Sequence, residues 1–155
     1  MAGARWEQAY RASFPRVYRA LIALGARADE AEDALQDAFV KGLSTTSVES
    51  VEGWLFVVSM RAWRRRRMRD RLLVPFSALA RERTAETDPV ARIALFAALR
   101  RLPERQAQVL VARYLVGLSQ EETARALGIT RGTVGATTTQ AAGALRRALM
   151  TEGDR

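Results

Sequence analysis

The chain has 155 residues, with 48% apolar and 27% charged side chains, which is the balance of an ordinary folded protein. It contains no cysteine and no histidine, so disulfides, thiolate nucleophiles, imidazole bases and the commonest zinc ligands are excluded. The formal net charge is +8 and comes mostly from arginine, which favours nucleic acid as a partner, although an acidic protein or an anionic lipid would also suit a basic face.

The first part of the chain has helical periodicity. Apolar side chains recur every three or four residues over 6–22, which predicts one helix, or a pair broken at Pro15, ending near Gly25. A second helix is predicted to begin at Asp29, which can act as its N-cap. Its polar face is a candidate docking surface for a basic partner and comprises Glu32, Asp33, Gln36 and Asp37.

A third helix is predicted from Trp54, and it continues into a run of arginines. Guanidinium groups on all sides of a helix suit contacts with a nucleic-acid backbone, and an adjacent tryptophan can stack on bases. Such a run is also common as an ordinary solvated face. The candidate DNA-binding residues here are Arg61, Trp63, Arg64, Arg65, Arg66, Arg67 and Arg69.

The periodicity is lost over residues 73–88, which include Pro75 and a mixed polar run. This composition predicts a flexible linker between two domains, residues 1–72 and 89–155. Helical patterns account for both domains and no strand is needed. We therefore expect an all-α protein made of two small helical domains.

The second domain contains a candidate helix-turn-helix. Ser119 and Glu122 form a capping-box pattern, and residues 128–130 separate the short helix that they start from a longer one. This spacing is that of a motif whose second helix enters the major groove, although a plain helical hairpin shares it. The DNA-contacting residues expected at the start of the second helix, opposite its apolar stripe, are Thr130, Arg131, Thr133, Thr137 and Gln140.

Motifs along nearly the whole chain resemble the extracytoplasmic-function (ECF) group of sigma-70 family RNA polymerase sigma factors. Residues 29–39 are similar to the polymerase-docking helix of that family, and residues 53–58 to the start of its minus-ten recognition helix. The strongest similarities lie in residues 99–106, 114–122 and 127–134.

The resemblance implies a sigma factor that binds core RNA polymerase and directs promoter-specific initiation. Residues 1–72 would be sigma domain 2, which docks on the β′ clamp helices and opens the minus-ten element of promoter DNA. Residues 89–155 would be sigma domain 4, which binds the minus-thirty-five element and the β flap. The polar face of the second helix would make the polymerase contact, and an anti-sigma factor would be a further partner.

Three departures from the family pattern fall where the family touches DNA. Arg61 stands in place of an asparagine, Arg65 in place of an acidic residue, and residues 135–142 lack the usual arginines. These differences keep open a sigma-like regulator with altered or lost promoter recognition. A basic helical protein-interaction module is the alternative from another functional class.

Several absences are also expected. No set of side chains supplies a nucleophile, a general base or a metal site, so we expect a binding protein without catalytic residues, a cofactor or a metal. The N-terminus lacks an apolar signal core, and no stretch approaches the roughly 18 apolar residues of a membrane span. We therefore expect no membrane span and a cytoplasmic location.

Overall fold

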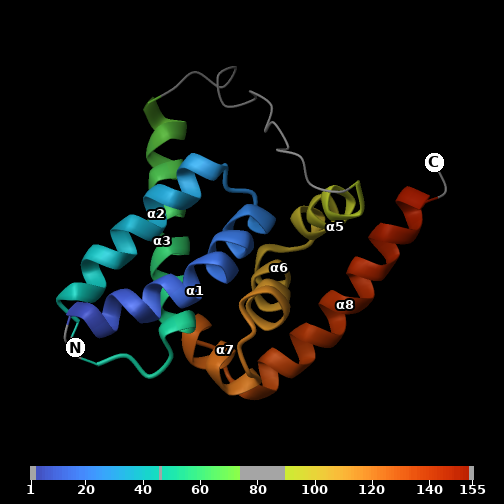
Figure 1. Ribbon diagram of the computed structural model, residues 1–155. Coiled ribbons are helices and arrows are strands. Elements are labelled where there is room, and N and C mark those ends of the chain that lie inside the picture. The colour runs from blue at the N-terminus through green and yellow to red at the C-terminus, as the bar shows by residue number, and fades with distance from the viewer. Residues whose placement is uncertain (1–2, 46, 74–89, 154–155) are drawn as a thin grey trace.

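The computed structural model describes residues 3–45, 47–73 and 90–153, and its regular elements in these ranges are all helical (Figure 1). The first half of the chain forms α1 (Gly3–Leu24), α2 (Ala28–Leu43) and α3 (Val51–Leu73). The second half forms α5 (Val90–Arg101), α6 (Glu104–Val111), the π-helical turn η1 (Ala112–Val116), α7 (Gln120–Leu127) and α8 (Arg131–Gly153). The all-α prediction is confirmed. Among the described helices, none is long and apolar enough to cross a bilayer.

The helices α1, α2 and α3 pack around the indole ring of Trp6. Its Nε1 donates a hydrogen bond to the backbone oxygen of Phe39 at 3.0 Å, and the ring meets Trp54 edge-on with the centroids 5.5 Å apart. A Cβ atom on Gly42 would overlap the Trp6 ring. Helix α2 can therefore approach α1 this closely only because position 42 is a glycine.

The starts and ends of the first two helices refine the sequence prediction. Helix α1 runs through Pro15 without a break and ends before Gly25, whose φ of 113° only glycine adopts easily. Helix α2 begins at Ala28, so the prediction of Asp29 as its N-cap is wrong. Instead, the carboxylate of Glu30 accepts a hydrogen bond from the backbone N–H of Arg27 at 2.9 Å.

The helix-turn-helix forms as its capping residues predict. The hydroxyl of Ser119 accepts a hydrogen bond from the Glu122 N–H at 3.0 Å, and the Glu122 carboxylate accepts one from the Ser119 N–H at 2.8 Å. The predicted capping box of α7 is thus confirmed. Gly128, with φ of 67°, then closes α7 and turns the chain towards α8.

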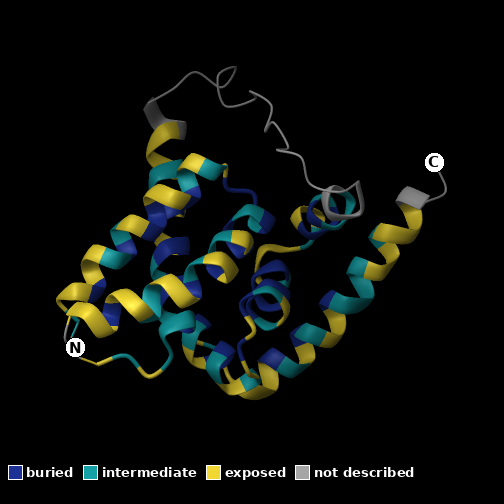
Figure 2. Ribbon diagram, in the orientation of Figure 1, coloured by how far each residue is buried: buried dark blue, intermediate teal, exposed yellow. Residues whose placement is uncertain are grey.

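The two halves of the chain pack against each other and share a core. Helix α1 contacts α5, α6 and η1, while α3 contacts η1 and α7, and the buried apolar side chains form one cluster from Trp6 to Ala141. Figure 2 shows buried residues along the inner sides of both halves, and exposed ones on α2 and on the outer side of α8. Most of the predicted linker, residues 73–88, lies outside the described residues.

Candidate nucleic-acid interface

The arginine block, defined here as Arg61, Arg64, Arg65, Arg66, Arg67 and Arg69, occupies the C-terminal half of α3. Arg61, Arg65 and Arg69 are exposed to solvent. Arg64 is also exposed, but it forms an ion pair with Glu104 of α6. Because the block is wound around a helix, only part of its charge faces away from the rest of the chain.

Arg66 connects the arginine block to the polar face of α2. Its guanidinium lies 2.5 Å from the Asp37 carboxylate and 3.8 Å from that of Asp33. Glu32 and Gln36, which share this face, are exposed. The structure thus brings together two sets of residues that were predicted to bind different partners.

Trp63, the aromatic residue predicted to stack on bases, is buried with only 4% of its surface exposed. The guanidinium carbon of Arg67 lies 5.6 Å from the centre of its ring, within the range of a cation–π contact. In this arrangement a base cannot reach the ring.

The N-terminal half of α8 presents most of its predicted DNA-contacting side chains to solvent. Arg131, Thr133 and Gln140 are exposed. The hydroxyl of Thr130 accepts a hydrogen bond from the Thr133 N–H at 3.1 Å, which caps the helix. Arg131, Thr133 and Gln140 are therefore accessible on a helix, and Thr130 caps the start of that helix.

Thr137 does not lie opposite the apolar stripe of α8, so that part of the prediction is wrong. It is buried, with 9% of its surface exposed. The reason is helix geometry: position 137 is three residues after Val134 and four before Ala141, and both of these are fully buried. Thr137 therefore belongs to the packed face of α8 and not to its exposed one.

Arg125 of α7 holds the helix-turn-helix against the first half of the chain. Its guanidinium lies 2.5 Å from the Glu49 carboxylate and 2.7 Å from that of Glu121. The hydrogen bond and charge of Arg125 lower the pKa of Glu121 below its ordinary value. Both side chains of the Glu121–Arg125 pair are more than half exposed, so salt will weaken it.

An apolar groove runs between α8 and the helices α5, α6 and η1, and sequence analysis missed it. Its volume is about 370 Å³, and leucines from several helices line it together with Tyr114 and the side chain of Arg146. Tyr114 is 68% exposed. The apolar stripe of α8 continues to Leu149, beyond the buried part of the helix. These apolar residues, more than the core needs, were the feature of the sequence that could have predicted the groove.

Comparison with known proteins identifies relatives over almost the whole chain. Residues 92–145 match the family model described as Sigma-70, region 4. The ECF RNA polymerase sigma factor SigM of Mycobacterium tuberculosis is 31% identical over 159 residues in strains Erdman and H37Rv. The alignment covers 96% of this chain and 80% of SigM.

Solved structures with low sequence identity share the fold. The sigma factor RpoE of Bartonella quintana, solved with the anti-sigma factor NepR, is 21% identical with a TM-score of 0.77, over 94% of this chain and 97% of that one. CnrH, solved with the cytosolic domain of CnrY, is also 21% identical, with a TM-score of 0.69 over 94% and 88% of the two chains. Both matches include helices from each half of the present chain.

Proposed function

Since the chain belongs to the ECF RNA polymerase sigma factors, we propose that it binds core RNA polymerase and directs transcription initiation at specific promoters. The observation that carries this proposal is the helix-turn-helix of α7 and α8, with Arg131, Thr133 and Gln140 exposed on the second helix. The chain acts by binding, and catalysis belongs to the polymerase. We expect it to work in the cytoplasm, beside that enzyme.

The polar face of α2 is the proposed docking site for the β′ clamp helices. Glu32, Asp33 and Gln36 are exposed side by side, and Asp37 is half-buried beside them. A carboxylate-rich face of this kind suits a basic partner and steers its approach. Because Arg66 pairs with Asp33 and Asp37, polymerase docking would compete with a contact inside the chain.

The promoter contacts are proposed to come from both halves. The exposed arginines of α3 would hold the backbone around the minus-ten element, and the N-terminal turn of α8 would contact the minus-thirty-five element in the major groove. Two modest sites joined in one chain bind much more strongly together than either alone.

The apolar groove beside α8 is the proposed site for the β flap. Its lining is almost wholly apolar, with Tyr114 and Leu149 at the surface, so a helix with an apolar face would bury area that water now covers. An anti-sigma factor is proposed as a second partner. Its support is the fold shared with RpoE and CnrH, of which RpoE was solved with its anti-sigma factor.

A sigma-like regulator with altered promoter recognition is the second candidate function. The observation that favours it is the composition of α8, where residues 132–140 contain no arginine or lysine. Without cations along the recognition helix, phosphate contacts that fix the motif in the groove would be fewer.

The test combines capture of purified core polymerase with transcription by the reconstituted holoenzyme on a library of genomic fragments. Capture with initiation at defined fragments supports the sigma factor. Capture without initiation supports the regulator, and absence of capture overturns both and favours the protein-interaction module. Gln36→Lys on α2 is expected to weaken capture at least tenfold, while Gln8→Lys, the same change on an exposed position of α1, leaves it unchanged.

A further inference from the structure

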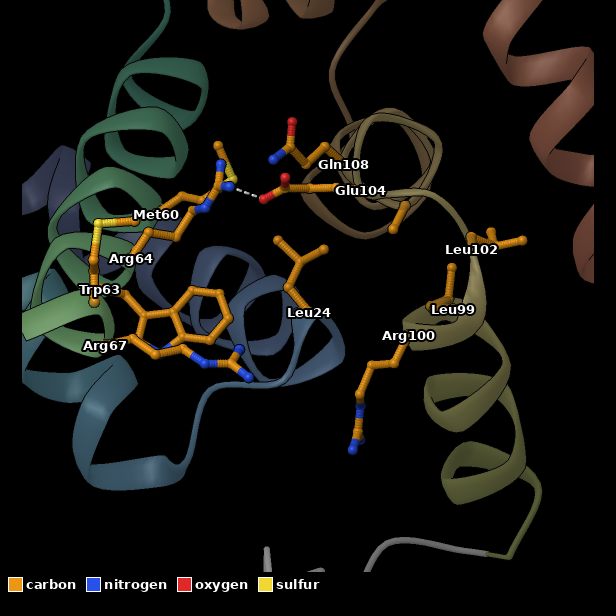
Figure 3. Close-up of a pocket in the computed structure, with 12 residues that line it drawn as sticks. Leu24, Met60, Trp63, Arg64, Arg67, Leu99, Arg100, Leu102, Glu104 and Gln108 are labelled. Atoms are coloured by element: carbon orange, nitrogen blue, oxygen red, sulfur yellow. Dashed lines mark ion pairs between the residues drawn. The ribbon is translucent and has the colours of Figure 1, made fainter. Parts of the chain in front are cut away.

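Two ion pairs join the halves of the chain in opposite senses. Arg64 on α3 of the first half pairs with Glu104 at the start of α6 in the second half, and Figure 3 shows the two side chains pointing toward each other. Arg125 on α7 of the second half lies 2.5 Å from the carboxylate of Glu49, in the loop before α3. Each half thus supplies a carboxylate to an arginine of the other, and we call these contacts the reciprocal ion pairs.

The second half is attached to α3 at two separate places. At the start of α3, a Cβ atom on Gly53 would lie 3.8 Å from Cδ1 of Leu118, which is buried just before α7 and close in sequence to Arg125. Arg64 lies further along α3 by about three turns, which is ~16 Å at the rise of an α-helix. Two attachments this far apart fix both the position and the orientation of the second half beside α3.

The attachment at Glu104 also involves the helix-turn-helix. Glu104 lies in the first turn of α6, where the helix dipole favours a carboxylate. The next side chain, Arg105, donates a hydrogen bond from Nη1 to the carbonyl of Leu127 at the end of α7, at 3.2 Å. Through these two neighbouring residues, the start of α6 contacts both α3 and α7. The arginine block and the helix-turn-helix are therefore held in one arrangement.

This arrangement is too short for the two promoter elements of the proposed function. The minus-ten and minus-thirty-five elements are about 25 base pairs apart, which is ~85 Å of B-form DNA at the rise of its base pairs. Helix α3 has 23 residues and is about 35 Å long, and α7 is attached close to its start. The arginine block therefore lies within roughly that length of α7. Both elements can be contacted together only after the halves separate.

The reciprocal ion pairs also engage two cations that suit DNA. Arg64 is a candidate DNA contact, and Arg125 belongs to the first helix of the helix-turn-helix, which crosses the DNA backbone in such motifs. Each guanidinium faces a carboxylate, whose negative charge would also repel a phosphate. All four side chains are at least 45% exposed, so these are weak pairs that a polyanion can displace.

We propose that the reciprocal ion pairs hold the free chain closed, and that their release lets the two halves separate and bind DNA together. The shared core brings the halves into contact, and the ion pairs set how often the halves part. The DNA step rests on the proposed function. The closing step rests on contacts within the chain and can be tested without DNA or polymerase.

The experiment measures how often the halves of the full chain separate. The chain has no cysteine, so Leu118→Cys introduces a single thiol at the contact with Gly53, and its rate of reaction with a thiol reagent reports the separation. Glu49→Gln combined with Glu104→Gln removes both reciprocal ion pairs and should raise this rate about tenfold, because each exposed pair contributes about threefold. An unchanged rate would overturn the proposal.

A matched control makes the same change in charge and leaves the halves joined. Glu7→Gln combined with Glu121→Gln removes two carboxylates that pair with exposed arginines one turn away on their own helices. The partner of Glu121 is Arg125, so the control also alters the surroundings of that arginine. The rate should rise less than twofold. An equal rise in both double variants would overturn the proposal, because net charge would then be the cause.

A second thiol distinguishes separation of the halves from unfolding. Leu35→Cys places the thiol on α2 inside the first half, where Leu35 is fully buried. Its reaction rate should change less than twofold when Glu49 and Glu104 are both replaced by glutamine. A rise as large as that at Leu118→Cys would mean that the whole chain unfolds more often, and the proposal would fail.

DNA duplexes of two lengths test the consequence for binding. A duplex of about 40 base pairs is ~135 Å long and can contact both separated halves, whereas one of about 12 base pairs is ~40 Å long and cannot. Without the reciprocal ion pairs, affinity should rise at least threefold for the long duplex and less than twofold for the short one. Equal gains would overturn the DNA step. The thiol rates stay interpretable if the proposed function itself fails.

Discussion

The two helices proposed to contact DNA use their polar side chains in different ways. Helix α3 concentrates positive charge, but Arg64 pairs with Glu104 and Arg66 with Asp37, so part of that charge is engaged within the chain. Helix α8 has a single cation in its first turn, Arg131, and it is exposed. The contrast shows that the number of charges on a helix does not give the number available to a partner.

The hydroxyl groups of α8 extend this contrast. Thr138 donates a hydrogen bond to the Val134 carbonyl at 2.7 Å, and Thr139 donates one to the Gly135 carbonyl at 3.2 Å. These hydroxyls serve the helix backbone, which leaves mainly their methyl groups for a base edge. Helix α3 therefore carries many positive charges, some of which are engaged within the chain. Helix α8 is accessible to a partner but carries little charge.

The largest expected effect concerns salt-dependent DNA binding. Replacing the exposed Arg61, Arg65 and Arg69 with glutamine should reduce the slope of log affinity against log salt by up to about 2.7, at about 0.9 for each phosphate that an arginine no longer neutralises. Arg131→Gln on α8 should reduce it by about 0.9 at most. Fluorescence anisotropy with a labelled duplex over a salt series measures both.

A control and a contradictory outcome sharpen this measurement. Arg147→Gln, at an exposed position late in α8, should leave the slope nearly unchanged. If Arg131→Gln alone matched the triple variant, α8 and not α3 would supply the main backbone contact, and the comparison between the helices would be reversed.

The next prediction concerns the stability contributed by Gly135 and Gly143, two glycines inside α8. A Cβ atom on Gly135 would lie 3.9 Å from Nε2 of Gln120 and one on Gly143 would lie 3.6 Å from Nη1 of Arg147, so alanine fits at both positions. Each substitution should raise the free energy of unfolding by about 0.5–1 kcal/mol, because glycine loses more backbone entropy than alanine does when it enters a helix. Urea denaturation followed by circular dichroism measures this change.

Gly42→Ala is the contrasting control, because its new methyl group would overlap the Trp6 ring. It should lower the free energy of unfolding by roughly 1–3 kcal/mol. A stability gain at position 42 would contradict the packing described for α1 and α2.

A smaller effect tests whether the ion pair with Asp37 makes Arg66 less available to DNA. Asp37→Asn removes the carboxylate 2.5 Å from its guanidinium and should strengthen binding of the isolated chain to a DNA duplex about twofold, the scale of an exposed ion pair. Glu32→Gln makes the same charge change on the same helix and should have less effect. Equal gains, measured by anisotropy at low salt, would mean that only net charge matters.

The smallest effect is the pH dependence of the Glu121–Arg125 pair within α7. The pKa of Glu121 is lowered, chiefly by its hydrogen bond to Arg125, so the stability from this pair is present above the unfolded-state pKa and is lost as pH falls through the folded-state pKa. NMR titration of the Glu121 carboxylate should show its pKa rise towards the ordinary value in Arg125→Gln. An unchanged pKa would contradict the pairing.

Much of the local structure was predictable because it depends on near neighbours in the chain. The capping box of Ser119 and Glu122 and the turn at Gly128 follow from residue types at fixed spacing, and both form. The burial of Thr137 was also available from its spacing to Val134 and Ala141. The exposure of Tyr114 could not be predicted in this way, because η1 is π-helical and its side chains do not follow the α-helical period.

The sequence by itself predicted the helices and the helix-turn-helix, since each rests on spacing within a few turns, and its resemblance to a family proposed which residues contact DNA and polymerase. Only the tertiary structure decided which of those residues are accessible. The partners Arg66 and Asp37 are 29 positions apart, and Arg125 and Glu49 are 76 apart. Such pairs depend on how whole helices pack, and the same packing buries Trp63.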